Sequence, residues 1–390
     1  MRSLRTGRII GLLLLISVVS SCGGGGGTSS SGKTNVHRAY VANSGAKTVT
    51  GYTIDQTSGA LTSTGTTTVG NLPDSVVADP QGRFAYVANT LDNTVSAFTI
   101  NARTGELTSA GTATTGGNTI YVNADPLSRF LYATNWNTND VTVFTINASS
   151  GALTKMDCGG GTGCGVSNPG NFAVGTTPYS NTAFDLAGKF AYLAIQGDNA
   201  VARFAIDQTT GALSSKVTAT TGTAPTYVAI DPAGKFAYVA NTTSNDVSAY
   251  VISAADGTLA QIDCGGGAGC NGKNFAAGAY PNSIAIDPAG KLLYVANANA
   301  NTVSAYTING TSGALTTVSG SPYSVGPSAY GSLSVATDPA GKFLYATSNQ
   351  THSVTGFVIN GTTGQLTPLA GSPFAAGLNA GFISTTVTSY

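Results

Sequence analysis

Short apolar runs bounded by turn residues follow one another along this chain, and one such run recurs seven times. Each copy starts with tyrosine and reads as a β-strand: Tyr40-Val-Ala-Asn43, Tyr86-Val-Ala-Asn89, Tyr132-Ala-Thr-Asn135, Tyr192-Leu-Ala-Ile195, Tyr238-Val-Ala-Asn241, Tyr294-Val-Ala-Asn297 and Tyr345-Ala-Thr-Ser348. The tyrosines are 46, 46, 60, 46, 56 and 51 residues apart. A period of roughly 40–50 residues is typical of a repeat architecture, in which each unit packs on the next.

Each unit is expected to contain four strands. The fifth unit reads TYVAID, PAGK, FAYVAN, TTSND, VSAYVI, SAADG and TLAQI, which alternates strand-like and turn-like segments. Its first turn, Asp-Pro-x-Gly-Lys, has the residues that a type I turn prefers at these positions. This turn recurs at Asp79-Pro80, Asp125-Pro126, Asp231-Pro232, Asp287-Pro288 and Asp338-Pro339, with Asp185-Leu186 as a variant. Loops that end in glycine, such as residues 55–59, indicate a hairpin between the third and fourth strands.

Seven units of four strands predict an all-β fold, a seven-bladed β-propeller over residues 36–390. The first unit begins directly with its second strand at Arg38, so its innermost strand is missing. The chain ends with a surplus strand over residues 382–388. We expect this C-terminal strand to complete blade 1 and close the ring, because closure pairs edges that would otherwise be exposed.

The repeated motifs carry a family resemblance. The YVAN strand, the T-V-S-A-Y strand after it and the DPAGK turn before it resemble the bacterial YVTN-type propellers. These are grouped with the lactonase-like seven-bladed propellers, which include 6-phosphogluconolactonases and muconate-lactonising enzymes. The resemblance covers essentially residues 36–390 and implies a propeller fold. It also implies lactone hydrolysis, although the matching motifs are those that build blades.

The N-terminal residues read as an export signal. Basic Arg2, Arg5 and Arg8 precede an apolar run over residues 9–19, which is too short to span a bilayer as a helix. Residues 19–22, Val-Ser-Ser-Cys, resemble a bacterial lipobox, which implies a signal peptide over residues 1–21 and lipidation of Cys22. Residues 22–35, rich in Gly and Ser, suit a flexible tether. An ordinary cleaved secretion signal is the alternative.

The four remaining cysteines form two similar pairs in glycine-rich segments. Because an exported protein meets an oxidising compartment, we expect disulfides Cys158–Cys164 and Cys264–Cys270. Metal binding is the alternative, but the spacing is not that of zinc C-x₂-C units, and no metal or other cofactor is expected. Both loops are expected to lengthen blade-to-blade links and to stand over the ligand face.

The composition narrows the classes of partner. Only 9% of the residues are charged and the formal net charge is zero. Without a stripe of clustered Lys and Arg, nucleic acid is not an expected partner. We expect a monomer that is exported and held in the bacterial cell envelope by its lipid, on the periplasmic or the cell-surface side. An envelope protein or a carbohydrate is the expected ligand.

Ligands of propellers usually bind at the central mouth, on the face that carries the loops after the YVAN strands. The ligand-face candidates are Trp136, Asn89, Asn135, Asn241 and Asn297. An exposed tryptophan stacks well on a sugar ring, whereas a tryptophan packed on the next blade is the structural alternative. For the asparagines the alternative is that each closes a turn by bonding its own backbone.

Residues suited to catalysis are few. Lactone hydrolysis needs a base that activates water and a group that stabilises the oxyanion. The weak candidates are Asp74 in a link, His352 in a loop of the last blade, and Arg203, which replaces a small residue of the third strand. Arg203 is alternatively a core residue bound to backbone carbonyls. We therefore expect a binding or protein-interaction module, with a lactone-ring hydrolase (a carboxylic ester hydrolase of the 6-phosphogluconolactonase type) as the alternative.

Overall fold

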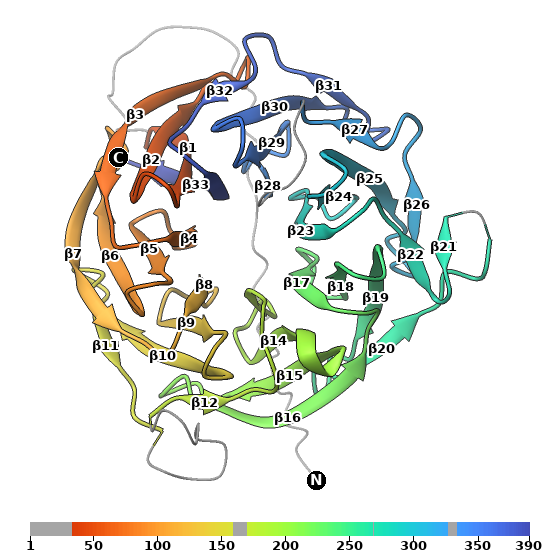
Figure 1. The fold of residues 1–390 in the computed structure, drawn as a ribbon, viewed down its shortest axis with the longest axis horizontal. Helices are drawn as coiled ribbons and strands as arrows, with labels where there is room; N and C mark the ends of the chain where they lie inside the picture. The colour runs from red at the N-terminus through yellow and green to blue at the C-terminus, as the bar shows by residue number, and fades with distance from the viewer. Residues whose placement is uncertain (1–32, 159–169, 268, 327–333) are drawn as a thin grey trace, which may run out of the picture. The chain divides into compact units, whose positions relative to one another are not determined.

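The computed structural model describes residues 33–158, 170–267, 269–326 and 334–390. In these ranges, residues 34–390 form one unit that contains seven antiparallel sheets. Figure 1 shows the sheets as blades around a central axis. The seven-bladed propeller is thus confirmed. The signal segment 1–21, the lipidation candidate Cys22, most of the tether and Cys164 lie outside the described residues.

The first four blades follow the chain from red to green in Figure 1. Blade 1 contains β1 (Asn35–Asn43), β2 (Thr48–Ile54), β3 (Leu61–Thr68) and β33 (Ala380–Ser389). Blade 2 contains β4 (Pro73–Ala78), β5 (Phe84–Asn89), β6 (Thr94–Ile100) and β7 (Leu107–Thr114). Blade 3 contains β8 (Thr119–Ala124), β9 (Phe130–Asn135), β10 (Asp140–Ile146), β11 (Leu153–Lys155) and β12 (Phe172–Ala173). Blade 4 contains β13 (Thr182–Phe184), β14 (Phe190–Ile195), β15 (Ala200–Ile206) and β16 (Leu213–Thr220).

The remaining three blades complete the ring. Blade 5 contains β17 (Pro225–Ile230), β18 (Phe236–Asn241), β19 (Asp246–Ile252), β20 (Leu259–Ile262), β21 (Cys270–Asn271) and β22 (Asn274–Ala276). Blade 6 contains β23 (Pro281–Ile286), β24 (Leu292–Asn297), β25 (Thr302–Ile308), β26 (Leu315–Thr317) and β27 (Tyr323–Ser324). Blade 7 contains β28 (Val335–Thr337), β29 (Phe343–Ser348), β30 (Ser353–Ile359), β31 (Leu366–Pro368) and β32 (Phe374–Ala375).

The ring is closed by the C-terminal strand. β33 pairs antiparallel with β1, from Asn35 opposite Ser389 to Asn43 opposite Ala380. It is the innermost strand of blade 1 (Figure 1). The prediction that residues 382–388 complete blade 1 is confirmed, and the strand extends further at both ends.

The outer strands differ from the simple four-strand pattern. In blades 3, 5, 6 and 7 the outer strand is in two pieces. β11 and β12 both pair with β10, β20 and β22 with β19, β26 and β27 with β25, and β31 and β32 with β30. The cysteine-rich insertions lie within the outer strands of blades 3 and 5, so their predicted place in the blade-to-blade links is wrong. Figure 1 shows β21 at the outer edge of the ring. The predicted disulfide Cys264–Cys270 is present.

Each recurring tyrosine joins its blade to the next. Its hydroxyl donates to the carbonyl of a glycine in the neighbouring blade's hairpin between the third and fourth strands. The seven bonds are Tyr40–Gly105, Tyr86–Gly151, Tyr132–Gly211, Tyr192–Gly257, Tyr238–Gly313, Tyr294–Gly364 and Tyr345–Gly59, at 2.7–3.2 Å. The tyrosine side chains are fully buried. The most frequent motif of the sequence is therefore an inter-blade contact that runs once around the ring.

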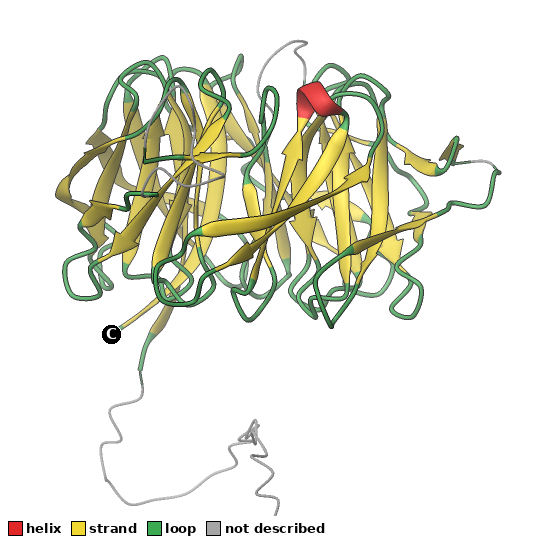
Figure 2. Ribbon diagram, turned by 90° about the horizontal axis from the view of Figure 1, so that it is seen from below, coloured by secondary structure: helices red, strands yellow, loops and turns green. Residues whose placement is uncertain are grey.

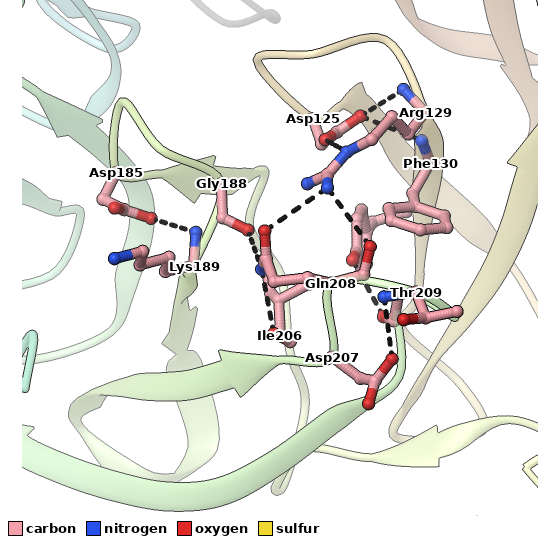
Figure 3. Close-up of polar contacts among 12 residues, drawn as sticks. Asp125, Arg129, Phe130, Asp185, Gly188, Lys189, Ile206, Asp207, Gln208 and Thr209 are labelled. Atoms are coloured by element: carbon pink, nitrogen blue, oxygen red, sulfur yellow. Dashed lines mark hydrogen bonds and ion pairs between the residues drawn. The ribbon is translucent and has the colours of Figure 1, made fainter.

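The repeated turn aspartates are used within their own turns. Asp125 Oδ1 accepts hydrogen bonds from the backbone N–H groups of Arg129 and Phe130 at 2.5 and 2.9 Å (Figure 3). The Arg129 guanidinium donates to Asp125 Oδ2 at 2.9 Å and to Gln208 of blade 4 at 3.3 Å (Figure 3). Asp125 thus folds its turn and orients Arg129, which contacts the neighbouring blade.

The two faces of the propeller carry different loops. The upper face carries the loops between second and third strands and the links between blades; it includes η1 (Gln196–Asp198), the only helix in the described ranges. The lower face carries the Asp-Pro turns and the hairpins between third and fourth strands. Figure 2 shows the C-terminus on this face, opposite to the helix η1. Thr34 hydrogen-bonds the backbone of Tyr390, so the chain enters the propeller on the lower face. No described helix has the length and apolarity to cross a membrane.

Candidate functional site

The asparagines that end the second strands are buried and hydrogen-bonded inside their blades. Asn89 Nδ2 donates to the hydroxyls of Thr94 and Ser96 of the third strand, and its Oδ1 accepts from the Gly70 N–H of the link. Equivalent bonds from Nδ2 to the third strand are made by Asn135, Asn241 and Asn297. All four side chains have zero exposed surface. They tie strand to strand and present no group at the surface of the upper face.

The central channel is closed beneath the upper face by three aromatic rings. Tyr121 of β8, Tyr227 of β17 and Phe382 of β33 come from blades 3, 5 and 1. Their ring centroids are 6.3, 5.6 and 6.1 Å apart, so each ring contacts the other two. Such contacts are favourable beyond the area that they bury. We call this layer the aromatic floor.

Above the aromatic floor, inner-strand residues and one link enclose a small cavity of about 30 Å³, which we call the mouth. Its walls include Asp74 of β4, Tyr179 of the link before β13, and Asn282 of β23. The Tyr179 ring packs edge-on against Tyr121, and Trp136 packs edge-on against Tyr179, each at 6.2 Å. Trp136 keeps 41% of its surface exposed. The mouth is therefore lined by both aromatic and polar side chains.

Asp74 is the titratable carboxyl of the mouth. Burial raises its pKa, and the hydrogen bond from Thr90 opposes this shift. The Thr90 hydroxyl lies 2.7 Å from Asp74 Oδ2 and 2.7 Å from the Thr119 carbonyl. Because the hydroxyl has one hydrogen, it donates to only one of these acceptors at a time. The carboxylate of Asp74 is thus only partly stabilised by the protein.

Replacing Asp74 by asparagine is expected to stabilise the protein at about pH 7 by about 1 kcal/mol. The asparagine amide can donate to Thr90 while Thr90 donates to Thr119, and the buried charge is removed. Since the folded-state pKa of Asp74 is raised, the wild type loses stability as the pH rises through that pKa. The advantage of Asp74→Asn should therefore be small at about pH 4 and larger at about pH 7. Thermal unfolding at both values measures it.

Asp246→Asn is the matched control on blade 5. The Asp246 carboxylate accepts hydrogen bonds from the side-chain amides of Asn241, Asn271 and Asn274. An asparagine there would turn one acceptor towards these donors, and we expect a loss of about 1–3 kcal/mol. If Asp74→Asn destabilised the protein by as much, Asp74 would serve the fold and our assignment of it to a ligand site would be wrong.

His352 occupies a position that asparagine fills in other blades. Its φ is 51°, in the left-handed region, and its Nδ1 accepts a hydrogen bond from the Asn379 N–H at 3.0 Å. Asn139 and Asn245 have the same conformation, and their side-chain oxygens accept from the N–H groups of the following links. The structure thus places His352 at the link between blade 7 and β33.

Arg203 lies between blades 4 and 5, towards the lower face. Its guanidinium donates to the carbonyls of Ser215 and Asp256, and its Cζ is 4.6 Å from the centre of the Phe190 ring. Of the three catalytic candidates, only Asp74 lines the mouth. Nowhere in the described ranges do three His, Cys, Asp or Glu side chains gather as a metal site requires.

The aromatic floor and Tyr179 were not among the residues predicted from the sequence. A signal for the floor exists at the equivalent inner-strand position of each blade, which holds Ser75, Tyr121, Asn181, Tyr227, Ser283, Ser334 and Phe382 in ring order. Three large rings among four small or polar residues stand out once the strands are aligned by their pairing. Tyr179 has no equivalent, because the link before blade 4 has one extra residue between its left-handed Thr177 and the inner strand.

Comparisons with known proteins agree with this architecture. A candidate 6-phosphogluconolactonase from Bacteroides uniformis is 19% identical with a TM-score of 0.69, over 91% of this chain and 99% of that one. The periplasmic gluconolactonase PpgL from Pseudomonas aeruginosa is 17% identical with a TM-score of 0.70, over 90% and 99%. AztD from Citrobacter koseri is 12% identical with a TM-score of 0.59, over 91% and 99%. At these identities the likeness shows the fold alone. No curated protein matches the sequence.

The family itself is shown by the sequence. Residues 33–164, 173–268 and 270–330 match the family described as "Lactonase, 7-bladed beta-propeller", which is well over half of the chain. The matched ranges include Asp74, Tyr121, Trp136, Tyr179 and Asn282. This chain therefore belongs to the seven-bladed β-propeller lactonase family.

Proposed function

We propose that this protein is a binding module whose ligand site is the opening of the mouth. The ligand is a small ring-shaped molecule of carbohydrate type that lies over the opening and inserts one polar group into the cavity of about 30 Å³. The observation that carries the proposal is that one carboxyl, Asp74, lines the same cavity as the rings of Tyr121 and Tyr179. Aromatic rings pack against the apolar C–H face of a sugar, whereas carboxylates and amides bond its hydroxyls. Asn282 supplies the amide in the mouth.

The single tryptophan of the chain reports on this site. Trp136 packs on Tyr179 and is partly exposed, so a ligand that stacks on Tyr179 should change its emission. We expect saturable fluorescence changes with monosaccharides or aldonolactones, and we expect Tyr179→Ala to abolish them. Trp136→Phe removes the signal and calorimetry then measures binding directly. If calorimetry detects no binding of any sugar or lactone, the proposal is wrong.

We further propose that the propeller is held at the bacterial cell envelope by a lipid on Cys22, after removal of residues 1–21. The support is the lipobox-like sequence and the glycine-rich tether. Thr34, where the tether joins the propeller, lies on the face opposite to the mouth. Cys22→Ala should move the protein from the membrane fraction to the soluble envelope fraction. An unchanged membrane fraction contradicts the lipid anchor.

A lactone hydrolase is the second candidate function, favoured by the family match and by the raised pKa of Asp74. In this reading Asp74 takes a proton from water and the hydroxide attacks the lactone carbonyl carbon, while the Tyr121 or Tyr179 hydroxyl donates to the oxyanion of the tetrahedral intermediate. The ring C–O bond then breaks as the carbonyl re-forms, and protonated Asp74 returns the proton to the leaving ring oxygen. Asp74→Asn should abolish turnover on a lactone panel, and His352→Ala should leave it unchanged. Turnover that persists in Asp74→Asn excludes this mechanism.

A further inference from the structure

The described lining of the mouth carries negative charge and no positive charge. Of the described residues that line it, Asp74 is the only charged one. Three other aspartates interact with a lysine: Asp198 forms an ion pair with Lys216, Lys47 helps the Asn71 hydrogen bonds to lower the pKa of Asp92, and Lys155 opposes the rise that burial causes in the pKa of Asp140. By contrast, the hydrogen-bond partner of Asp74 within the described ranges is the neutral Thr90 hydroxyl, which contacts only Oδ2. Among the described residues no hydrogen bond reaches Oδ1 of Asp74, so this atom can accept one from a ligand.

A half-buried carboxylate without a cationic partner has a definite chemical preference. Withdrawing the charge from water costs free energy that an incoming cation can offset and that an incoming anion increases. The neighbouring rings act in the same direction, because the negative face of an aromatic ring attracts a cation. Tyr121, Tyr179 and Trp136 form a continuous row of edge-on contacts beside Asp74. Carboxylate and rings together favour a positively charged group.

We propose that the mouth selects a sugar ring that carries an ammonium group, an amino sugar, with Asp74 as the residue that determines this specificity. This inference rests on the proposed function, since it names the class of ligand for the same site. The ammonium group pairs with Asp74 Oδ1, and the C–H face of the sugar packs on Tyr179 and Trp136. A phosphorylated sugar would bring its phosphate next to an unpaired carboxylate and is disfavoured.

The test compares sugars that differ at one substituent. Glucosamine, N-acetylglucosamine and glucose are titrated into the mature protein, with binding followed by Trp136 fluorescence and calorimetry. A desolvated charge pair is worth enough that we expect glucosamine to bind about 10-fold or more tightly than the two neutral sugars. In Asp74→Asn, which should fold because its amide keeps the bond to Thr90, the three sugars should bind within about 2-fold of each other.

Asp92→Asn is the matched control variant. Asp92 lies on the same face, but its carboxylate is bound by the backbone and side-chain N–H groups of Asn71. We expect the preference for glucosamine to be unchanged in this variant. Equal affinities for glucosamine and glucose in the wild type, or a preference that survives Asp74→Asn, overturn the inference and leave the proposed sugar site standing. Absence of binding by all three sugars and by lactones overturns both.

Discussion

Removal of residues 380–390 is expected to unfold the propeller. These residues form β33, which supplies the inner edge of blade 1 and the Phe382 ring of the aromatic floor. Without them, the inner edge of β1 is exposed and the contact between blades 7 and 1 loses Ala380 and Ile383. The blades of a closed ring stabilise one another and are not expected to fold independently. We therefore expect the truncation to remove most of the free energy of unfolding, which is of order 5–15 kcal/mol. Circular dichroism and thermal unfolding measure it.

Removal of residues 1–33 is the matched control for this truncation. The propeller is formed by residues 34–390, which group together by their own contacts. We expect the loss of residues 1–33 to leave the melting temperature of the propeller unchanged. If the C-terminal truncation melted at the temperature of the intact protein, β33 would not close the ring, and the structural role given to it here would be wrong.

The fold was predictable because its main contacts repeat. The tyrosines of the second strands and the aspartates of the turns each make the same contact in successive blades, so selection for one geometry leaves one pattern in the sequence. Ring closure was predictable from a strand missing at the start and one in excess at the end. The broken outer strands were not, because an edge strand pairs on one side only and its pattern is weak. The cis peptide bonds before Pro322 and Pro373 lie where two of these outer strands are interrupted.

The candidate site was predictable only in part. Asp74 and Trp136 depart from the repeat and lie on the upper face, which the order of strands indicates without coordinates. The floor of the mouth was missed because Tyr121, Tyr227 and Phe382 come from three blades that are far apart in the sequence. His352 shows the opposite difficulty. Its position in a loop of the upper face made it a catalytic candidate. In the structure its backbone has the left-handed conformation, and its ring accepts a hydrogen bond from the following link, as Asn139 and Asn245 do in other blades.

Tyr238 makes the most direct test of the ring of inter-blade contacts. Its side chain is fully buried and packs in the core between blades 5 and 6, and its hydroxyl donates to the Gly313 carbonyl at 2.9 Å. Gly313 has a φ of 74°, and a Cβ there would lie 2.4 Å from the Phe236 ring. No larger residue therefore fits at position 313. The hydroxyl and the hairpin are therefore held in one arrangement.

Tyr238→Phe keeps the ring and removes one hydrogen bond, so we expect a loss of about 1 kcal/mol in the free energy of unfolding. Tyr238→Ala also leaves a cavity between blades 5 and 6, and we expect a loss of about 3–5 kcal/mol. The exposed Tyr390 provides the control, since Tyr390→Ala should cost less than about 1 kcal/mol. Because each blade is held by both neighbours in a closed ring, the variants should still unfold in one cooperative transition. Denaturant unfolding followed by Trp136 emission and by circular dichroism tests this, and two separate transitions would mean that the blades are stabilised individually rather than through the tyrosine contacts around the ring.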